Sequence, residues 1–393
     1  MARVKLREAL DNLDPNLTRV FLPWILRHPR YLRASASLVP AINRAWKVRR
    51  EEQAKGLIVP PVLILSITSR CNLQCVGCYA GAVGITPDVD SEGKLKTLVE
   101  LPREQWRKII TEASELGVFA FVIAGGEPFM FPGLIELCQE FKNRLFIIIT
   151  NGLAISEDDF KRLKRSTNIA AIVSIEGDSK ITDARRGKGV YGKAVKTIQR
   201  IAKSGVVTGV SVTITNLNYK YWMDPEFIDD FINMGVRIGV FTEYIPTTPE
   251  IEFGLKSRQA NIPGGDNGLM LDKEERAQFR SQVLKFRDTK SIYIIHSPGD
   301  EEFFGGCVSA GRGFAHVTPG GDLTPCPVSN IATHNLSEKT LRKGLASELF
   351  KTIRENENLL ETEGFPCALF AHPEEVNTLA RTVGAYRTYS KRD

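Results

Sequence analysis

Cys71, Cys75 and Cys78 stand close together in the stretch Cys-Asn-Leu-Gln-Cys-Val-Gly-Cys, with the spacing CxxxCxxC. Thiolates bind soft metals, and an iron–sulfur cluster normally takes four of them. Three thiolates so near one another therefore predict a four-iron cluster with one iron left open to a non-protein ligand. The alternatives are part of a zinc site, or buried cysteines without a ligand role. Zinc sites usually draw paired CxxC knuckles from two places, and the sequence holds no second close pair.

An apolar, β-branched run at residues 61–68 directly precedes these cysteines and predicts a buried strand. Strand-like and helix-like segments alternate from there on. We expect strands at 61–68, 118–124, 145–150, 169–175, 207–215 and 237–244, and helices at 102–116, 132–143, 156–165, 191–204 and 225–234. Six such β–α units predict an α/β fold, a parallel sheet curled by right-handed crossovers into a partial, TIM-like (β/α)6 barrel. Ligands of such folds bind at the carboxyl ends of the strands, so functional residues should follow strands directly.

Gly125, Gly126, Glu127 and Pro128 meet that expectation, since they follow the second predicted strand. Adjacent glycines let the backbone come close to a ligand. Backbone carbonyls at such a place are suitable acceptors for an ammonium group. A Gly-Gly-Glu-Pro segment can also be a simple turn, but its position directly after a strand favours a ligand site.

Other polar residues follow the next three strands. Asn151 lies in the turn Thr-Asn-Gly after the third strand. Ser174 and Glu176 close the fourth strand and share one face, because side chains alternate along a strand. Thr213 lies near the end of the fifth strand. We expect these side chains at the mouth of the barrel; ordinary surface polarity at strand ends is the alternative.

The cysteine loop and the Gly-Gly-Glu-Pro segment resemble the radical S-adenosylmethionine (SAM) superfamily, and the resemblance covers roughly residues 61–370. In that family the amino and carboxylate groups of SAM chelate the open iron of a [4Fe-4S] cluster. An electron from the cluster cleaves SAM to methionine and a 5′-deoxyadenosyl radical, which abstracts a substrate hydrogen. The resemblance implies that Cys71, Cys75 and Cys78 hold the catalytic cluster.

The same resemblance implies SAM-binding roles. Residues 125–128 match the segment that holds the SAM amino group, and Glu176 matches an acidic position that accepts from ribose hydroxyls. Arg186, in Thr-Asp-Ala-Arg-Arg-Gly, is similar to the arginine of the HDxxRG segment, and its guanidinium fork suits the SAM carboxylate. Gly77 stands where the family usually has an aromatic residue against the adenine, and Tyr79 is the nearby aromatic candidate. The predicted set is completed by Asn151, Ser174 and Thr213.

A second set of cysteines comprises Cys307, Cys326 and Cys367. The first two flank a segment that reads as a hairpin around Pro-Gly-Gly-Asp. This hairpin resembles the start of a SPASM or twitch domain, where such cysteines bind an auxiliary [4Fe-4S] cluster. Scattered structural cysteines are the alternative.

The cysteine count favours the shorter, twitch-like form. Of seven cysteines, Cys138 falls on the apolar face of a helix and is expected in the core, which leaves three for the second set. The sequence does not reveal a fourth ligand. His316 and His372 are weak candidates, and an open iron that binds substrate is equally consistent with the pattern.

The chain has 393 residues, 42% of them apolar, enough for one large domain and a smaller one. We expect a basic helical arm at 1–58, the partial barrel at 59–246, a loop or lid with a connecting helix at 247–300, and the auxiliary domain at 301–393. Seven cysteines without a signal sequence predict a cytoplasmic protein, and a solvent-accessible cluster favours anaerobic conditions.

The net charge of +6 is concentrated in the arm. Residues 1–60 hold 12 Lys and Arg against 5 Asp and Glu, a net charge of +7, so the remaining chain is close to neutral. Apolar residues recur at helical spacing in two arm segments: Leu17, Val20, Phe21 and Trp24, then Leu38, Ile42, Ala45 and Trp46. Basic amphipathic helices either pack on a neighbouring domain or lie on a membrane surface, which makes peripheral membrane contact a second interpretation. Nucleic acid is not expected to bind.

These observations predict an enzyme that generates a 5′-deoxyadenosyl radical, with flavodoxin or ferredoxin as electron donor. The arm makes a lipid-like or hydrophobic substrate the first interpretation, ahead of a ribosomal peptide or protein side chain and then a tetrapyrrole or other cofactor precursor. A non-catalytic iron–sulfur electron carrier or redox sensor is the alternative of another class. It predicts clusters without SAM binding and leaves the Gly-Gly-Glu-Pro and Arg-Gly segments without a purpose.

Overall fold

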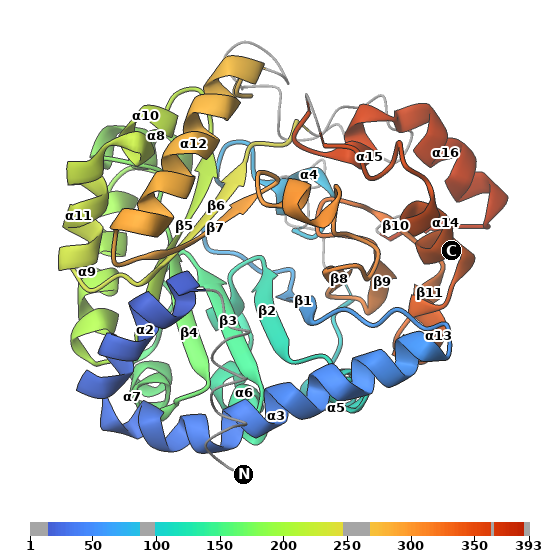
Figure 1. Ribbon diagram of the computed structural model, residues 1–393, viewed down its shortest axis with the longest axis horizontal. Coiled ribbons are helices and arrows are strands. Elements are labelled where there is room, and N and C mark those ends of the chain that lie inside the picture. The colour runs from blue at the N-terminus through green and yellow to red at the C-terminus, as the bar shows by residue number, and fades with distance from the viewer. Residues whose placement is uncertain (1–14, 87–98, 247–267, 363–364, 389–393) are drawn as a thin grey trace, which may run out of the picture.

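A ten-stranded sheet occupies the centre of the molecule (Figure 1). The computed structural model describes residues 15–86, 99–246, 268–362 and 365–388. The strand order in these residues is β11-β9-β8-β1-β2-β3-β4-β5-β6-β7, and neighbours from β8 through to β7 are parallel. The parallel strands are β1 (Val62–Thr68), β2 (Ala120–Gly125), β3 (Leu145–Thr150), β4 (Ile169–Ser174), β5 (Val207–Ile214), β6 (Ile238–Glu243), β7 (Tyr293–Ser297) and β8 (Phe314–Val317). The predicted α/β class with a largely parallel sheet is confirmed.

The sheet extends beyond the six predicted strands at both edges. β7 follows the long helix α12 and pairs with β6, so it adds a parallel strand after the six β–α units. β8 pairs in parallel with β1, although some 250 residues separate Ile64 from its partner His316. Local periodicity carries no information about that pairing.

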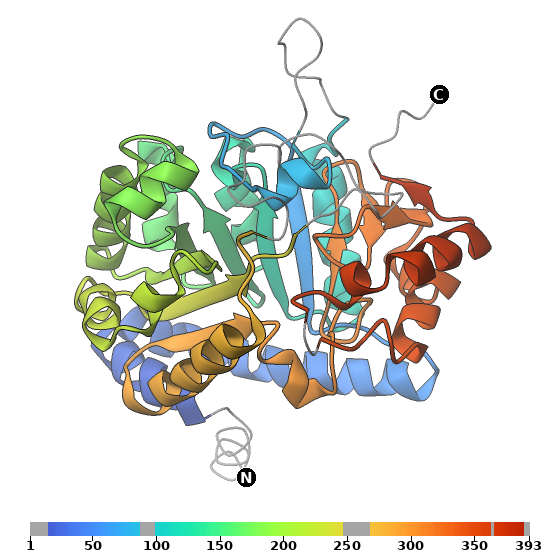
Figure 2. The same ribbon diagram turned by 90° about the horizontal axis from the view of Figure 1, so that it is seen from above.

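Helices on the outside of the sheet bury one apolar stripe each against it (Figures 1 and 2). The repeat helices are α5 (Arg103–Glu115), α6 (Leu134–Glu140), α7 (Glu157–Arg165), α9 (Val190–Lys203), α11 (Pro225–Asn233) and α12 (Lys273–Thr289). Shorter elements are α4 (Tyr79–Ala82), η1 (Pro128–Met130), α8 (Ser179–Arg186) and α10 (Tyr219–Met223). Trp106 of α5 is fully buried, and Cys138 of α6 is 1% exposed, as expected for a core cysteine.

The arm forms α2 (Pro15–Arg27) and α3 (Pro29–Ala54), which lie along the side of the barrel where the strands begin (Figure 1). The Arg30 guanidinium donates to the carbonyls of Lys164 and Gly205, in the segments that lead into β4 and β5. Arg49 donates to the carbonyl of Gly117, ahead of β2, at 2.7 Å. The arm therefore packs on the barrel, at the end opposite to the carboxyl ends of the strands. Within the described residues, no helix is both long enough and apolar enough to cross a bilayer.

The carboxyl-terminal region continues the sheet past β1. β9 (Asp322–Thr324) forms the predicted antiparallel hairpin with β8, and β11 (His334–Asn335) pairs with β9. The rest of this region consists of η2 (Glu301–Phe304), β10 (Ile331–Ala332), α13 (Leu341–Leu345), α14 (Glu348–Glu355), α15 (Ala368–Ala371), α16 (Pro373–Thr382) and β12 (Tyr386–Arg387). The sheet thus runs across the expected boundary at residue 300, and the four domain ranges stay predictions. Most of the predicted lid, residues 247–267, lies outside the described residues.

Candidate active site

The cysteine loop after β1 is held by the Gly-Gly segment after β2. The Gly126 amide donates to the Thr68 carbonyl, and the Glu127 amide donates to the Arg70 carbonyl, both at 2.8 Å. A Cβ atom on Gly126 would lie 2.1 Å from the Arg70 carbonyl oxygen, and Gly125 has a φ of +121°. Both glycines are therefore required by the close approach of the backbone that leads into Cys71.

Replacing Gly126 with alanine is expected to push the loop away from β2. The new methyl group would clash with backbone rather than with a movable side chain, so a loss of about 2 kcal/mol in the free energy of unfolding is expected. Iron bound after reconstitution should fall as well, because the loop carries the cysteines. Urea unfolding and an iron assay measure both effects.

Gly192 provides the matched control for that substitution. It lies within α9, and nothing stands within 4 Å of the position where its Cβ would be. Alanine there should raise stability by about 0.5 kcal/mol, since alanine is the better helix former, and leave the iron content unchanged. Equal iron contents in the Gly126→Ala and Gly192→Ala proteins would contradict the role given to Gly126.

The Glu127 carboxylate is turned into the protein. It accepts from the Thr150 hydroxyl at 2.6 Å, the Asn151 amide at 2.7 Å and the Phe129 amide at 3.2 Å. Burial raises its pKa, and these hydrogen bonds oppose the rise. The Asn151 side chain donates in turn to Asn72 in the cysteine loop at 2.7 Å. Glu127 thus joins the ends of β2 and β3 behind the loop, and the backbone of the Gly-Gly segment is the part left to face a ligand.

The three thiols of the loop lie within electrostatic reach of one another. Burial, together with the Cys78 and Cys75 thiolates and the Glu127 carboxylate, raises the pKa of Cys71 to about 12. Burial also raises the pKa of Cys75, while the neighbouring Arg186 lowers it. A partly buried set of thiols beside a cation suits a negatively charged thiolate cluster, since the thiols must lose their protons to bind metal.

A buried ion triad joins the loop to the ends of β4 and β5. Glu176 is fully buried, and its carboxylate pairs with Arg185 and with Arg186, the latter at 2.6 Å. The Thr213 amide donates to the same carboxylate at 3.2 Å. Arg185 also donates to the Val76 carbonyl, between the second and third cysteines, at 3.1 Å. Sequence reasoning selected Arg186 and overlooked Arg185, although the Arg-Arg doublet was visible.

The backbone conformation at position 77 explains why a glycine stands there instead of an aromatic residue. Gly77 has a φ of +63°, a left-handed conformation that a bulky side chain adopts only under strain. Arg185 donates to its carbonyl at 3.3 Å. Tyr79 lies close by, with its hydroxyl hydrogen-bonded to the Gly125 backbone, and burial raises its pKa. Ser174, 7% exposed, closes β4 on the same side of the sheet as these groups.

The second set of cysteines also converges, although its members are far apart in the sequence. Cys307, Cys326 and Cys367 are all at least nine-tenths buried. Burial raises the pKa of Cys307 to about 12, and Glu301 and Cys367 add to the rise. Burial likewise raises the pKa of Cys326, with Cys367 and Cys307 adding to it. The segments on either side of hairpin β8–β9 and the residue before α15 thus bring three thiols to one buried place. The carboxyl group of Glu301, which sequence reasoning missed, lies there too.

Of the two histidines named as candidate ligands, His316 has both ring nitrogens engaged away from these thiols. His316 is fully buried, with Nε2 at 2.7 Å from the Ser66 hydroxyl and Nδ1 at 2.7 Å from the Thr324 hydroxyl. Both ring nitrogens are therefore engaged in joining β1, β8 and β9. His372 begins α16 as its N-cap and lies 3.8 Å from the carboxylate of Glu375.

Stability should fall in acid because of His316. Burial lowers its pKa to about 3 in the folded protein, whereas an unfolded chain holds it near 6.5. Below pH 6.5 the unfolded state binds a proton that the folded state does not, so the folded state loses about 1.4 kcal/mol per pH unit down to pH 3. Urea unfolding at pH 7.5, 6 and 5 should show a shallower acid slope for His316→Gln than for the wild type. Parallel slopes would rule out His316 as the source.

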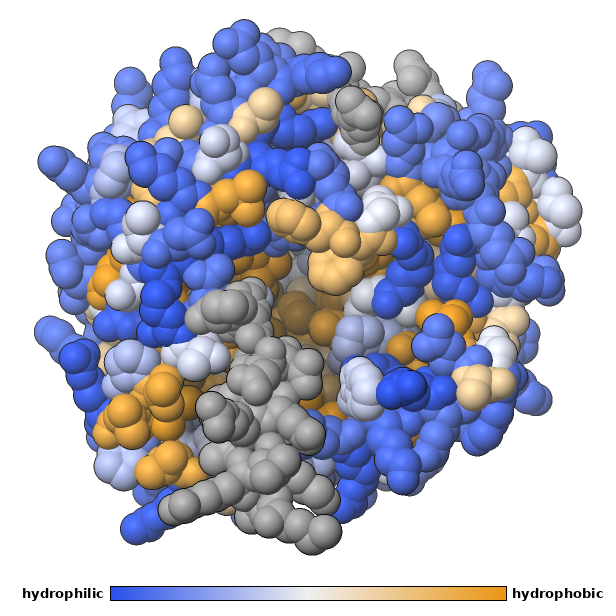
Figure 3. All heavy atoms as spheres, in the orientation of Figure 1, coloured by the Kyte–Doolittle hydropathy of each residue, from blue (hydrophilic) through white to orange (hydrophobic). Residues whose placement is uncertain are grey.

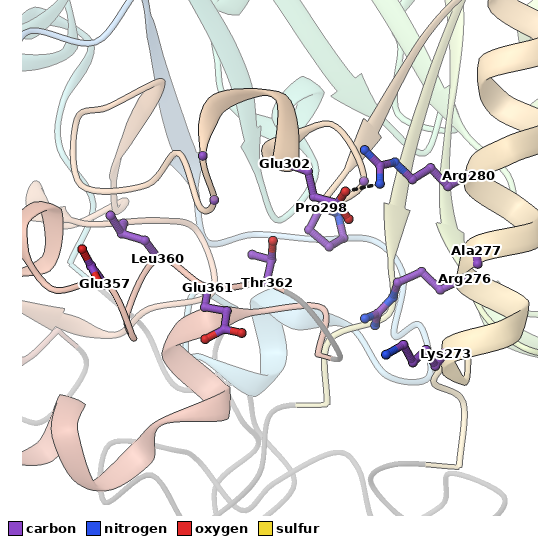
Figure 4. A pocket seen from close by; sticks show the side chains of 13 residues that line it. Lys273, Arg276, Ala277, Arg280, Pro298, Glu302, Glu357, Leu360, Glu361 and Thr362 are labelled. Atoms are coloured by element: carbon purple, nitrogen blue, oxygen red, sulfur yellow. Dashed lines mark hydrogen bonds and ion pairs between the residues drawn. The ribbon is translucent and has the colours of Figure 1, made fainter.

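A cavity of about 820 Å³ lies between α12 and the segment before Cys367 (Figure 4). Its walls carry both signs of charge: Lys273, Arg276, Arg280, Glu302, Glu357 and Glu361. The Arg276 guanidinium donates to Glu243, the last residue of β6, at 2.7 Å, which places the cavity by the carboxyl ends of the strands. Gly306, next to Cys307, lines the same cavity. The cavity therefore adjoins the second cysteine set as well as the barrel.

Part of a zinc site was one alternative for the first cysteine set. Within the part of the chain that the structure describes, no three Cys, His, Asp or Glu side chains lie close enough together to hold a single metal ion. An iron–sulfur cube is larger than one ion and takes its thiolates at wider spacing.

Comparisons with known proteins agree with this geometry. Residues 65–232 match the Radical SAM superfamily. Fe-coproporphyrin III synthase of Methanosarcina barkeri is 31% identical over 163 residues, which cover 41% of this chain and 38% of that protein. Mycofactocin maturase MftC of Mycobacterium tuberculosis is 26% identical over 328 residues, covering 78% of this chain and 75% of the relative. Among solved structures, Streptococcus suis SuiB bound to precursor peptide SuiA has a TM-score of 0.60 at 18% identity, covering 83% of this chain and 74% of SuiB, which supports the fold.

Cysteine loop, barrel and family match all indicate the same cofactors. Radical SAM proteins use SAM and a [4Fe-4S] cluster, and the relatives of SPASM type imply auxiliary clusters. The prediction made from the cysteine loop is confirmed: residues 65–232 form a domain of the radical SAM superfamily.

Proposed function

We propose that this chain is a radical SAM enzyme in which Cys71, Cys75 and Cys78 hold the catalytic cluster and the second cysteine set holds an auxiliary one. The observation that supports this most is the meeting of three thiols, Arg186 and the Gly-Gly backbone at the carboxyl ends of β1, β2 and β4. When bound, the cluster supplies the electron that cleaves SAM, and the 5′-deoxyadenosyl radical then abstracts a hydrogen from an unactivated carbon.

Different groups of the chain bind different parts of SAM. Backbone carbonyls of Gly125 and Gly126 accept from the amino group, and Arg186, held by Glu176, faces the carboxylate. Tyr79 and Ser174 lie where an adenosine would be covered. Charge-assisted hydrogen bonds from a guanidinium already held in place cost little ordering, which favours this arrangement. Asn151, Glu127 and Thr213 act through the backbone that they fix.

A peptide or protein side chain is the substrate class that we favour. The cavity beside the barrel mouth has cationic and anionic walls, which suits a chain carrying charged side chains better than an acyl chain. MftC is named a maturase, and SuiB was solved with its precursor peptide. The arm, on which a lipid-like substrate was inferred, packs at the opposite end of the strands. A tetrapyrrole precursor is the second candidate, favoured by the 31% identity to Fe-coproporphyrin III synthase.

The arm can still serve as a contact surface for a membrane. Leu22, Leu26, Leu32 and Trp46 are 48–63% exposed on α2 and α3. Figure 3 shows apolar side chains at the lower left, where α2 and the start of α3 lie in Figure 1. Exposed apolar residues among arginines favour peripheral binding to anionic lipid, and cosedimentation with vesicles of phosphatidylserine tests it. The electron donor that we propose is a flavodoxin or ferredoxin.

The decisive experiment uses protein purified without oxygen and reconstituted with iron and sulfide. About eight irons per chain and production of 5′-deoxyadenosine from SAM and dithionite are expected for two [4Fe-4S] clusters. About four irons with SAM cleavage would remove the auxiliary cluster. Iron without any SAM cleavage, also in the presence of candidate precursor peptides, would favour the electron carrier instead.

A further inference from the structure

The second cysteine set supplies three ligands, and a [4Fe-4S] cluster has four irons to ligate. Glu301 is the side chain that stands beside these thiols. It is the first residue of η2, and it is 7% exposed. Its carboxyl group lies close enough to the Cys307 and Cys367 thiols to raise the pKa of both.

The backbone holds Glu301 firmly, while its side chain is held weakly. The Glu301 amide donates to the Pro298 carbonyl at 2.7 Å, and the Gly306 amide donates to the Glu301 carbonyl at 3.0 Å. The carboxylate itself accepts from the Ser297 hydroxyl at 3.4 Å, which is a long hydrogen bond. Its position is therefore fixed, but its oxygens remain able to turn towards a metal.

Charge balance also points towards a cationic occupant. Within the described residues, no Lys or Arg forms an ion pair with Glu301. Arg312, the nearest cation, donates instead to the carbonyls of Phe304, Gly306 and Cys307. A buried carboxylate without a cation is costly, so such groups are usually paired or bound to metal. An iron of a cluster bound by the three thiols would supply the missing partner.

The neighbouring acidic residues point elsewhere. Glu302 pairs with Arg280 across the cavity, and Asp300 pairs with Arg287 at 2.6 Å. Figure 4 shows Glu302 turned towards Arg280. Of the three successive acidic residues, the outer two form ion pairs with arginines. Glu301, the middle one, lies beside the thiols instead.

We propose that Glu301 is the fourth ligand of the auxiliary cluster, through a carboxylate oxygen. This inference rests on the proposed function, because it requires a cluster on Cys307, Cys326 and Cys367. With four protein ligands the auxiliary cluster has no iron open to substrate. Its place beside the charged cavity then fits a role in electron transfer to or from a substrate bound there, without direct ligation.

The test uses the full-length chain with Cys71, Cys75 and Cys78 replaced by alanine, so that only the auxiliary cluster remains. The reduced protein is treated with ¹³C-cyanide, which binds an open iron, and the carbon coupling is measured by electron–nuclear double resonance. No coupling is expected in this parent. Glu301→Gln should introduce the coupling and should convert the cluster to [3Fe-4S] on mild oxidation. Glu302→Gln is the matched control and should behave as the parent does.

Glu301→Cys separates ligation from a structural role, because a thiolate can replace the carboxylate as a ligand. It should restore resistance to cyanide and to loss of iron. Strong cyanide coupling already in the parent would overturn the proposal, as would identical behaviour of the Glu301→Gln and Glu302→Gln proteins.

If the parent protein holds no iron, the auxiliary cluster is tested in the wild-type protein instead. The wild-type protein is then saturated with S-adenosylhomocysteine, which keeps the amino and carboxylate groups of SAM and covers the open iron of the first cluster. About eight irons per chain and no cyanide coupling there support Glu301 as ligand. About four irons there would overturn the proposed auxiliary cluster itself, and the ligand with it.

Discussion

Replacing Cys71, Cys75 and Cys78 together by alanine is expected to abolish 5′-deoxyadenosine production and to lower iron from about eight to about four per chain. The two thiol sets are carried by different segments, the loop after β1 and the segments on either side of the β8–β9 hairpin with the residue before α15. The second set is buried in its own surroundings, so losing the first should leave it intact. An iron assay and chromatography of the SAM products measure the two quantities.

Cys138→Ala is the matched control for that triple variant. Cys138 is 1% exposed, lies on α6 and packs in the hydrophobic core. The substitution should cost about 1 kcal/mol of stability through the small cavity that it leaves, and it should change neither iron nor SAM cleavage. Eight irons remaining in the triple variant would show that the loop is not a ligand set.

Local patterns predicted the barrel because its strands are short, apolar and β-branched and are followed by amphipathic helices. Each of the six predicted strands begins and ends within two residues of the observed bounds. The same patterns could not predict that β8 extends the sheet beside β1, since that pairing depends on tertiary contacts such as the hydrogen bond between Ser66 and His316.

Sequence reasoning found the residues whose chemistry few other residue types can supply. It missed the residues whose role depends on partners that only folding brings close. The cysteines and the glycine pair were visible because thiolates and close backbone approach have few substitutes. Arg185 and Glu301 were not, because an arginine or a glutamate is common on any surface until folding buries it. Trp46 shows the reverse error: it was placed on an apolar helix face, yet it is 53% exposed, with Arg50 stacked 4.6 Å from its ring centre.

Glu176→Gln should be among the most damaging single substitutions in the barrel. It leaves the guanidinium groups of Arg185 and Arg186 buried without their shared carboxylate, and breaking a buried ion pair costs about 3–5 kcal/mol. The Val76 carbonyl is held by Arg185, so the cysteine loop should loosen too. Urea unfolding should show the loss of stability, and calorimetry on the reconstituted protein should show SAM binding weakened about tenfold or more, equivalent to ~1.4 kcal/mol.

An exposed pair of the same chemistry shows why burial decides this outcome. Glu157 pairs with Arg200 on the surface, where the two side chains are 70% and 42% exposed, and solvent and salt screen such pairs. Glu157→Gln should therefore leave both the unfolding transition and the affinity for SAM unchanged. If Glu176→Gln unfolded at wild-type urea concentrations but lost SAM, the triad would serve the ligand alone. If it lost stability and kept SAM affinity, Arg186 would not depend on Glu176 for its position, and the guanidinium would have to be held by the cysteine loop itself.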